Sequence, residues 1–124
     1  MTIKTTLITG KLNDTSDRAL KENISDLGDS TYTLNQLKPR KFDWKRDEAS
    51  NTDLDNQVGF IAQEVEAVNS NLVSGNEGEK VIYTIGLVAI AVKTIQELSQ
   101  RVADRDAEIS ALEDRMYKIE QRLI

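Results

Sequence analysis

The sequence predicts an α+β protein that is mainly helical, with a small β-hairpin domain followed by a long C-terminal helix that forms a parallel trimeric coiled coil. Three observations support this fold class. Apolar residues repeat in heptads through the last third of the chain, and two short β-favouring runs flank an acidic loop in the middle. The length of 124 residues allows one small domain with an extended arm and excludes a second full-sized core.

The composition excludes several classes of function. The net charge is −5, from 16 Lys and Arg against 21 Asp and Glu, so we expect no nucleic acid as main partner. The absence of cysteine and histidine excludes disulfides, thiolate or imidazole metal sites and histidine-based triads. The uncharged run over residues 81–92 is shorter than the roughly 20 residues that span a bilayer. We therefore expect no metal, cofactor or membrane partner, and a cytosolic origin because residues 1–11 lack a secretory apolar core.

The first third of the chain contains a β-favouring run and two turn signals. Residues 2–9 predict a strand at the end of a larger upstream structure. The side-chain oxygens of Thr15, Ser16 and Asp17 can cap a turn or a helix start. A second turn at residues 28–30 precedes a short helical pattern, which should end at about Lys38 because a proline follows.

The middle third predicts a hairpin and a short helix. Residues 40–45 alternate like a half-buried strand, with Phe42 and Trp44 on one face, and a second strand follows at residues 58–61. From Ala62 the pattern is helical, and residues 69–80 form a surface loop. Phe42 and Trp44 beside lysines could stack on nucleic acid, but a core hairpin fits the alternation better. The acidic residues of the connecting loop lack the spacing of a calcium loop and predict a solvated loop instead. They are Asp47, Glu48, Asp53 and Asp55.

The last third gives the clearest pattern, a heptad repeat sustained over about five heptads. Ten of the eleven a and d positions of the repeat are apolar, and the exception is Arg105. A helix from residue 87 to 124 is about 55 Å long, which exceeds any core that the rest of the chain can build. Another chain must therefore bury most of this seam. The seam residues are Val88, Ala91, Ile95, Leu98, Val102, Arg105, Ile109, Leu112, Met116, Ile119 and Leu123. The alternative is a single long amphipathic helix folded against its own domain.

Charges beside the seam favour parallel packing of the helices. Arg101 would face Asp106 of a neighbour, and Arg115 would face Glu120, although a third pair is repulsive. Such exposed pairs contribute only a few tenths of a kcal/mol. Residues 115–120 resemble the Arg-h-x-x-h-Glu pattern of three-stranded coiled coils, which favours a trimer over a dimer. Arg105 is a defect that can fix register.

Without histidine or cysteine, the obvious nucleophilic pair is a hydroxyl and a neutral lysine amine. Ser16 and Lys21 lie five residues apart in a segment that contains several apolar residues. A lysine acts as a base only where burial or a nearby cation lowers its pKa from about 10.4. Taken alone, this spacing favours a capping serine and a solvated lysine over a catalytic pair.

Three blocks of the sequence, in order, resemble one known family. Thr15-Ser16-Asp17-Arg18-Ala19-Leu20-Lys21-Glu22-Asn23-Ile24 resembles the Ser-Asp-x-Arg-Leu-Lys-x-x-Ile opening of the intramolecular chaperone domains that end phage endosialidases, tailspikes and tail fibres. Residues 34–44 are similar to its Leu-x-x-Leu-x-Pro-x-x-Phe-x-Trp block, and residues 59–65 to its Gly-x-Ile-Ala-Gln-Glu-Val block.

The resemblance implies a homotrimeric chaperone that brings an upstream spike or fibre into register and then cuts itself off. Cleavage would fall between Thr15 and Ser16, with Ser16 as nucleophile and Lys21 as general base. Asp17, Arg18 and Asn23 are candidate supporting residues, and Gln63 and Glu64 are interpreted as structural. The implied domains are the stalk end at residues 1–15, the chaperone core at 16–86 and the trimerising helix at 87–124. Assembly would occur in the cytoplasm of a phage-infected host, and the passenger would end in the virion tail.

One position departs from the family pattern. Ala19 stands where the family usually has arginine before the Leu-Lys pair. The hypothesis is that this replacement slows or abolishes cleavage. Two alternatives remain, a structural trimerisation module that never cuts and a coiled-coil adaptor unrelated to phage.

Overall fold

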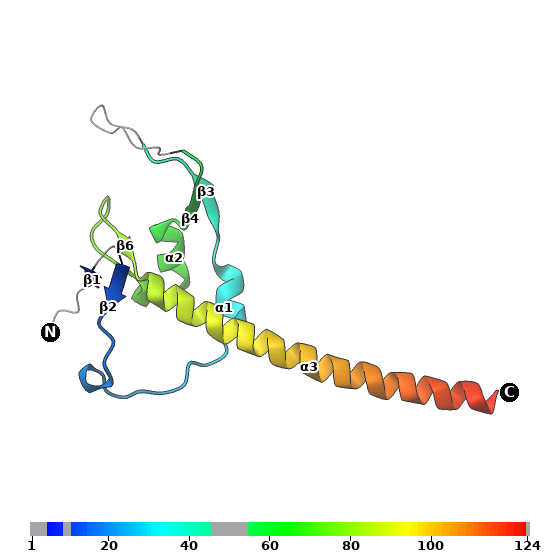
Figure 1. Ribbon diagram of the computed structural model, residues 1–124. Helices are drawn as coiled ribbons and strands as arrows, with labels where there is room; N and C mark the ends of the chain where they lie inside the picture. The colour runs from blue at the N-terminus through cyan, green and yellow to red at the C-terminus, as the bar shows by residue number, and fades with distance from the viewer. Residues whose placement is uncertain (1–4, 9–10, 46–54, 124) are drawn as a thin grey trace.

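The computed structural model describes residues 5–8, 11–45 and 55–123, and side chains from residue 15 onward within these ranges. The described chain is mainly helical, and its strands form small two-stranded antiparallel sheets (Figure 1). The strands are β1 (Thr5–Ile8), β2 (Lys11–Asp14), β3 (Arg40–Phe42), β4 (Gln57–Gly59), β5 (Val73–Ser74) and β6 (Val81–Ile82). The helices are η1 (Arg18–Leu20), α1 (Thr31–Gln36), α2 (Ala62–Val68), η2 (Ser70–Leu72) and α3 (Thr84–Arg122), of which η1 and η2 are single 3₁₀ turns.

The N-terminal sheet contains one strand that the sequence predicts and one that it does not. β1 lies within the predicted run at residues 2–9, of which residues 2–4 and 9 lie outside the described part. It pairs with β2, with Thr5 opposite Asp14 and Ile8 opposite Lys11. The sequence of β2 is polar and lacks strand periodicity. The strand is fixed by main-chain pairing, which leaves no pattern in the sequence. The proposed cleavage site therefore begins one residue after a strand.

The predicted hairpin and the short helices are present. β3 and β4 pair with Arg40 opposite Gly59 and Phe42 opposite Gln57. Helix α2 begins at Ala62 as expected and buries Val65. Helix α1 ends at Gln36, two residues before the predicted end at Lys38. Leu37 is already extended, with φ −70° and ψ 145°, which leads the chain toward the extended backbone that proline requires before it.

The expectation that the aromatic pair of the hairpin forms core was wrong. The rings of Phe42 and Trp44 meet edge to face, with centroids 5.1 Å apart, but Phe42 is only half-buried and Trp44 is 57% exposed. β3 ends at Phe42, and the hairpin points away from the helices (Figure 1). The aromatic pair therefore lies outside the buried cluster.

Residues 69–80, predicted as a plain loop, contain the turn η2 and the strand β5, which pairs with β6. The connection needs a left-handed backbone at Gly75, where φ is +98° and a Cβ would lie 2.8 Å from the carbonyl oxygen of Glu79. The sequence pattern missed β5 because it is only two residues long.

The hydrophobic core gathers where α2, η2, β5 and the start of α3 meet. Its buried residues are Val65, Leu72, Val73, Leu87 and Ile90, and partly buried Leu34 and Leu37 bring α1 against it. Such a small core contributes limited stability by itself.

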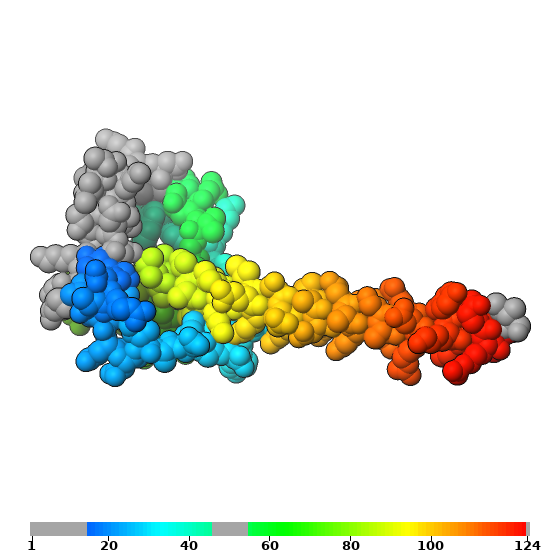
Figure 2. All heavy atoms as spheres, turned by 60° about the horizontal axis from the view of Figure 1, so that its bottom comes forward, coloured from blue at the N-terminus to red at the C-terminus, as the bar shows by residue number. Residues whose placement is uncertain are grey.

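Helix α3 carries two different faces. Its first turns pack on the core through Leu87, Ile90 and Thr94, and the rest projects far beyond the domain (Figures 1 and 2). The predicted seam lies on another face, where all its residues except half-buried Ala91 are exposed. Every described residue after Glu97 is exposed. Folding against its own domain therefore accounts for only the first part of this helix.

Thr94 provides a test of the packing between α3 and the core. It is 2% exposed, and its Oγ1 has no hydrogen-bond partner among the described residues. Because an unsatisfied buried hydroxyl destabilises, Thr94→Val should raise the free energy of unfolding by about 1 kcal/mol in urea titrations at one protein concentration. Thr84→Val, at an exposed position of the same helix, should change it little. A loss of stability in Thr94→Val would show that the hydroxyl has a partner.

Candidate functional site

Ser16 and Lys21 are brought together by the turn η1. Asp17 precedes the turn, and its Oδ1 accepts a hydrogen bond of 2.8 Å from the Ala19 amide. The amides of Leu20 and Lys21 donate to the carbonyls of Asp17 and Arg18, each at 3.0 Å. This tight turn returns Lys21 to Ser16, and Lys21 Nζ donates to Ser16 Oγ over 2.5 Å. The serine hydroxyl and the lysine nitrogen thus lie within hydrogen-bond reach, as general-base catalysis requires, and a neutral amine in this place would accept the hydroxyl proton.

The other candidate residues near this pair occupy structural or exposed positions. Asp17 caps the turn, which gives it a structural role in holding the pair. Arg18 and Ala19 are exposed members of η1. Asn23 adopts a left-handed backbone with φ 55°, which asparagine tolerates better than most residues, and so redirects the chain after Lys21. Thr15 lies directly after β2 and is exposed.

Both members of the pair are exposed to solvent in the single chain. Exposure matters because water stabilises an ammonium ion, and only the neutral amine accepts a proton. Chemistry at this pair therefore needs a further element that excludes water.

An ion pair joins the second and third blocks of the sequence. Arg40 of β3 donates through Nε to Glu64 Oε1 at 2.9 Å and through its second guanidinium nitrogen to Oε2 at 2.6 Å. This bidentate bond lowers the pKa of Glu64 and raises the pKa of Arg40. Sequence reasoning interpreted Glu64 as structural without naming its partner, because the two residues lie 24 positions apart.

The ion pair makes stability depend on pH. Because the pKa of Glu64 is lowered on folding, the stabilisation is present above the usual value of 4.5 and is lost as the pH falls through the lower folded value. Glu64→Gln should therefore be less stable than wild type at pH 7, with a difference that shrinks toward pH 3, measured as urea midpoints. In an Arg40→Met background, Glu64→Gln should change little. A difference that persists or grows in acid would contradict this assignment.

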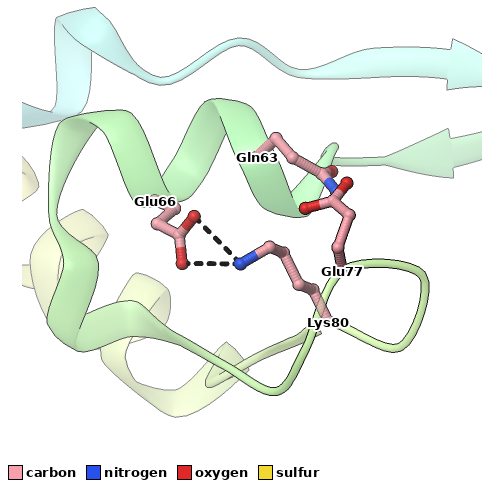
Figure 3. Close-up of polar contacts among 4 residues, drawn as sticks. All are labelled: Gln63, Glu66, Glu77 and Lys80. Carbon is pink, nitrogen blue, oxygen red and sulfur yellow. Dashed lines mark hydrogen bonds and ion pairs between the residues drawn. The ribbon is translucent and has the colours of Figure 1, made fainter.

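Two further contacts fix the loop between β5 and β6 to helix α2 (Figure 3). Lys80 Nζ lies 3.1 and 3.0 Å from the two carboxylate oxygens of Glu66. Gln63 Nε2 donates to Glu77 Oε1 over 2.8 Å. Gln63 thus holds the β5–β6 loop and Glu64 holds β3 against α2, and neither contacts Ser16 or Lys21.

A third polar cluster was missed by sequence reasoning. Glu97 of α3 accepts hydrogen bonds from the amides of Ser30 and Thr31, at 2.8 and 3.1 Å, and from Thr31 Oγ1 at 2.5 Å. The hydroxyl of Thr31 and these amides hold the pKa of Glu97 below its usual value. The partners are more than 60 residues apart, so no local pattern indicates the contact.

The described residues hold no group of three or more acidic side chains arranged to bind a metal ion. Of the acidic loop weighed for calcium, Asp47, Glu48 and Asp53 lie outside the described residues. None of the described helices is long and apolar enough to cross a membrane.

Comparison with known families identifies the segment that holds this pair. Residues 16–74 match a family model described as chaperone of endosialidase, whose family is named as a peptidase. The match begins at Ser16 and covers the turn η1, the hairpin β3–β4 and helix α2. The match supports the resemblance of the sequence to the chaperone of endosialidase family. No curated protein matches the chain.

Proposed function

We propose that this chain is an intramolecular chaperone that trimerises, assists the folding of an upstream phage tailspike or tail-fibre region, and is released by self-cleavage between Thr15 and Ser16. The observation that carries the proposal is the contact of Lys21 Nζ with Ser16 Oγ at the start of the segment that matches the family. On this proposal residues 1–15 end the stalk, residues 16–86 form the chaperone core and residues 87–124 form the trimerising helix. The reaction would take place in the host cytoplasm during phage assembly.

The exposed seam of α3 supports assembly of three chains. All seam residues except Arg105 are apolar, and all except half-buried Ala91 are exposed in the single chain, while a different face of the same helix packs on the core. Burying an apolar side chain of this size stabilises by about 1.5–3 kcal/mol, so a repeat of five heptads favours association strongly. The pairs of Arg101 with Asp106 and of Arg115 with Glu120 then favour parallel chains.

Water is the only co-reactant that the cleavage reaction consumes. Neutral Lys21 Nζ takes the proton of Ser16 Oγ, which attacks the Thr15 carbonyl carbon through a five-membered ring. The C–N bond breaks, the Ser16 nitrogen gains a proton, and Thr15 is left as an ester on Ser16 Oγ. Water then hydrolyses the ester, which gives a Thr15 carboxylate and restores the serine hydroxyl. The hydrogen bonds of η1 hold the two reacting groups together.

Assembly of the trimer would determine when cleavage starts. Ser16 and Lys21 are exposed in one chain, and burial favours the neutral amine that the first step needs. If neighbouring chains cover the pair, cleavage follows trimerisation and reports correct folding of the passenger.

A second candidate is a trimerisation module that stays attached. Ala19 favours it, because its methyl group stands where the family usually has arginine, next to the Leu20-Lys21 pair. Such a module would still align three chains but would leave the bond between Thr15 and Ser16 intact.

The chaperone role is tested on a chain with more upstream sequence, expressed with and without residues 84–124. Without them we expect the upstream β-structure to fail both to trimerise and to fold, judged by sedimentation and by resistance to detergent. An upstream region that folds without the helix would contradict the chaperone role. The chain would then be a coiled-coil adaptor.

A further inference from the structure

The segment between the Ser16–Lys21 pair and helix α1 has few attachments of its own. Residues 15–29 are all exposed, and residues 21–29 form neither helix nor strand. Ser30, at 3% exposed, is the first buried residue after the pair. Figure 1 shows this segment running beside α3 before it reaches α1. Its position relative to the rest of the molecule therefore depends on how its end at Ser30 is held.

That end is held by a side chain of α3. Glu97 accepts from both backbone amides at the start of α1 and from the hydroxyl of Thr31. These amides belong to the unpaired donors at a helix N-terminus, which a carboxylate satisfies well. Glu97 thereby joins the end of the segment to the long helix.

Ser30 strengthens this reading because it does not act as an ordinary cap. A serine at this position usually caps its own helix through its hydroxyl. Here Ser30 makes no such bond, and its Oγ donates instead to the Gly28 carbonyl at 2.9 Å. The hydroxyl fastens the last turn of the exposed segment, and capping of α1 is left to Glu97.

Glu97 also lies next to the exposed seam. Leu98, the following residue, belongs to the apolar seam and is 45% exposed. Any partner that packs on Leu98 restricts this turn of α3 and with it the carboxylate of Glu97. A physical connection thus runs from the seam through Glu97 and Ser30 to the segment that carries Ser16 and Lys21.

We propose that Glu97 is a positioning residue for self-cleavage, holding the segment that bears Ser16 and Lys21 in a fixed place beside the helix through which the chains assemble. The proposal rests on the proposed self-cleavage. Because η1 sets the contact within the pair, Glu97 sets where the pair lies relative to α3 and to neighbouring chains. Its loss should slow cleavage without preventing assembly.

The test measures cleavage rates in the trimer fraction by intact mass, in whichever of the wild-type and Ala19→Arg chains is cut faster. Glu97→Met, which keeps the side-chain length but accepts no hydrogen bond, should slow cleavage by about 10-fold to 100-fold, because the pair is then misplaced relative to the neighbouring chains that would cover it. Glu97→Gln should be intermediate, because its amide oxygen still accepts from one donor. Asp104→Met, one heptad further along the exposed helix, should leave the rate unchanged.

Cleavage of Glu97→Met at the parent rate would overturn the proposal, as would equal slowing by Asp104→Met. If Glu97→Met fails to assemble, Thr31→Val removes only the hydroxyl donor, and a trimer of this variant that cuts at the parent rate also overturns it. If neither parent chain is cut, self-cleavage itself is wrong and the role of Glu97 falls with it. The absence of cleavage in both parent chains is distinguishable from cleavage of Glu97→Met at the parent rate.

Discussion

Leu112→Asp should convert the assembled protein into monomers at micromolar concentration. Leu112 lies in the seam and is 54% exposed in the single chain, with no part of its own domain near it to be disturbed. In a trimer the substitution removes three leucines from one layer, each contributing about 1.5–3 kcal/mol, and places three like charges together. At about 1.4 kcal/mol for each factor of ten, association should weaken by at least a thousandfold.

The matched control for this substitution is Ala111→Asp. It introduces the same charge one residue earlier, at an exposed position of α3 outside the seam. We expect sedimentation to give trimers for Ala111→Asp and monomers for Leu112→Asp. The far-ultraviolet circular dichroism of Leu112→Asp should also fall, because a helix exposed on all sides is marginal in water. A trimeric Leu112→Asp would show that the seam is not the interface.

Ala19→Arg should accelerate the appearance of a product that begins at Ser16. Ala19 is an exposed member of η1 and directly precedes Leu20 and Lys21. Because the position is exposed, an arginine side chain fits there without a steric clash. A charge-assisted hydrogen bond to the scissile region stabilises by about 1.5–3 kcal/mol, which corresponds to roughly 10-fold to 100-fold in rate. The measurement is the first-order rate of mass loss of purified chain.

Two variants show whether that product arises from the proposed pair. Ser16→Ala should abolish cleavage in both the wild-type and the Ala19→Arg backgrounds. Lys21→Met should slow it by about 10²-fold to 10⁴-fold, the usual contribution of a general base. If wild type and Ala19→Arg are cut equally fast, or neither is cut, the departure at Ala19 has no bearing on activity.

The elements that the sequence predicted well are those with local signals. The heptad repeat, the proline after Lys38 and the alternation at residues 40–45 each depend on neighbours along the chain, and α3, the end of α1 and β3 follow from them. β2 and β5 were missed because main-chain pairing fixes them and their side chains carry little pattern. The exposure of Trp44 was also unexpected, because alternation predicts which residues share a face but not whether that face is covered.

In the candidate site, too, local contacts were predicted from the sequence and long-range contacts were not. Ser16 and Lys21 were found because they lie five residues apart within one motif, and the structure places them in contact. The partners of Glu64 and Glu97 were not found, since Arg40 and Ser30 are brought to them only by the fold. Long-range carboxylate contacts of this kind carry no local sequence pattern.

The most direct test of the central claim is the intact mass and N-terminal residue of the product from a chain that carries more of its upstream sequence. The proposal predicts a released fragment that begins at Ser16, formed in the trimer fraction and absent from Ser16→Ala and from monomeric Leu112→Asp. An uncut trimer, or a cut at any other bond, would contradict self-cleavage by this pair. Cleavage of the monomeric variant would contradict its dependence on assembly.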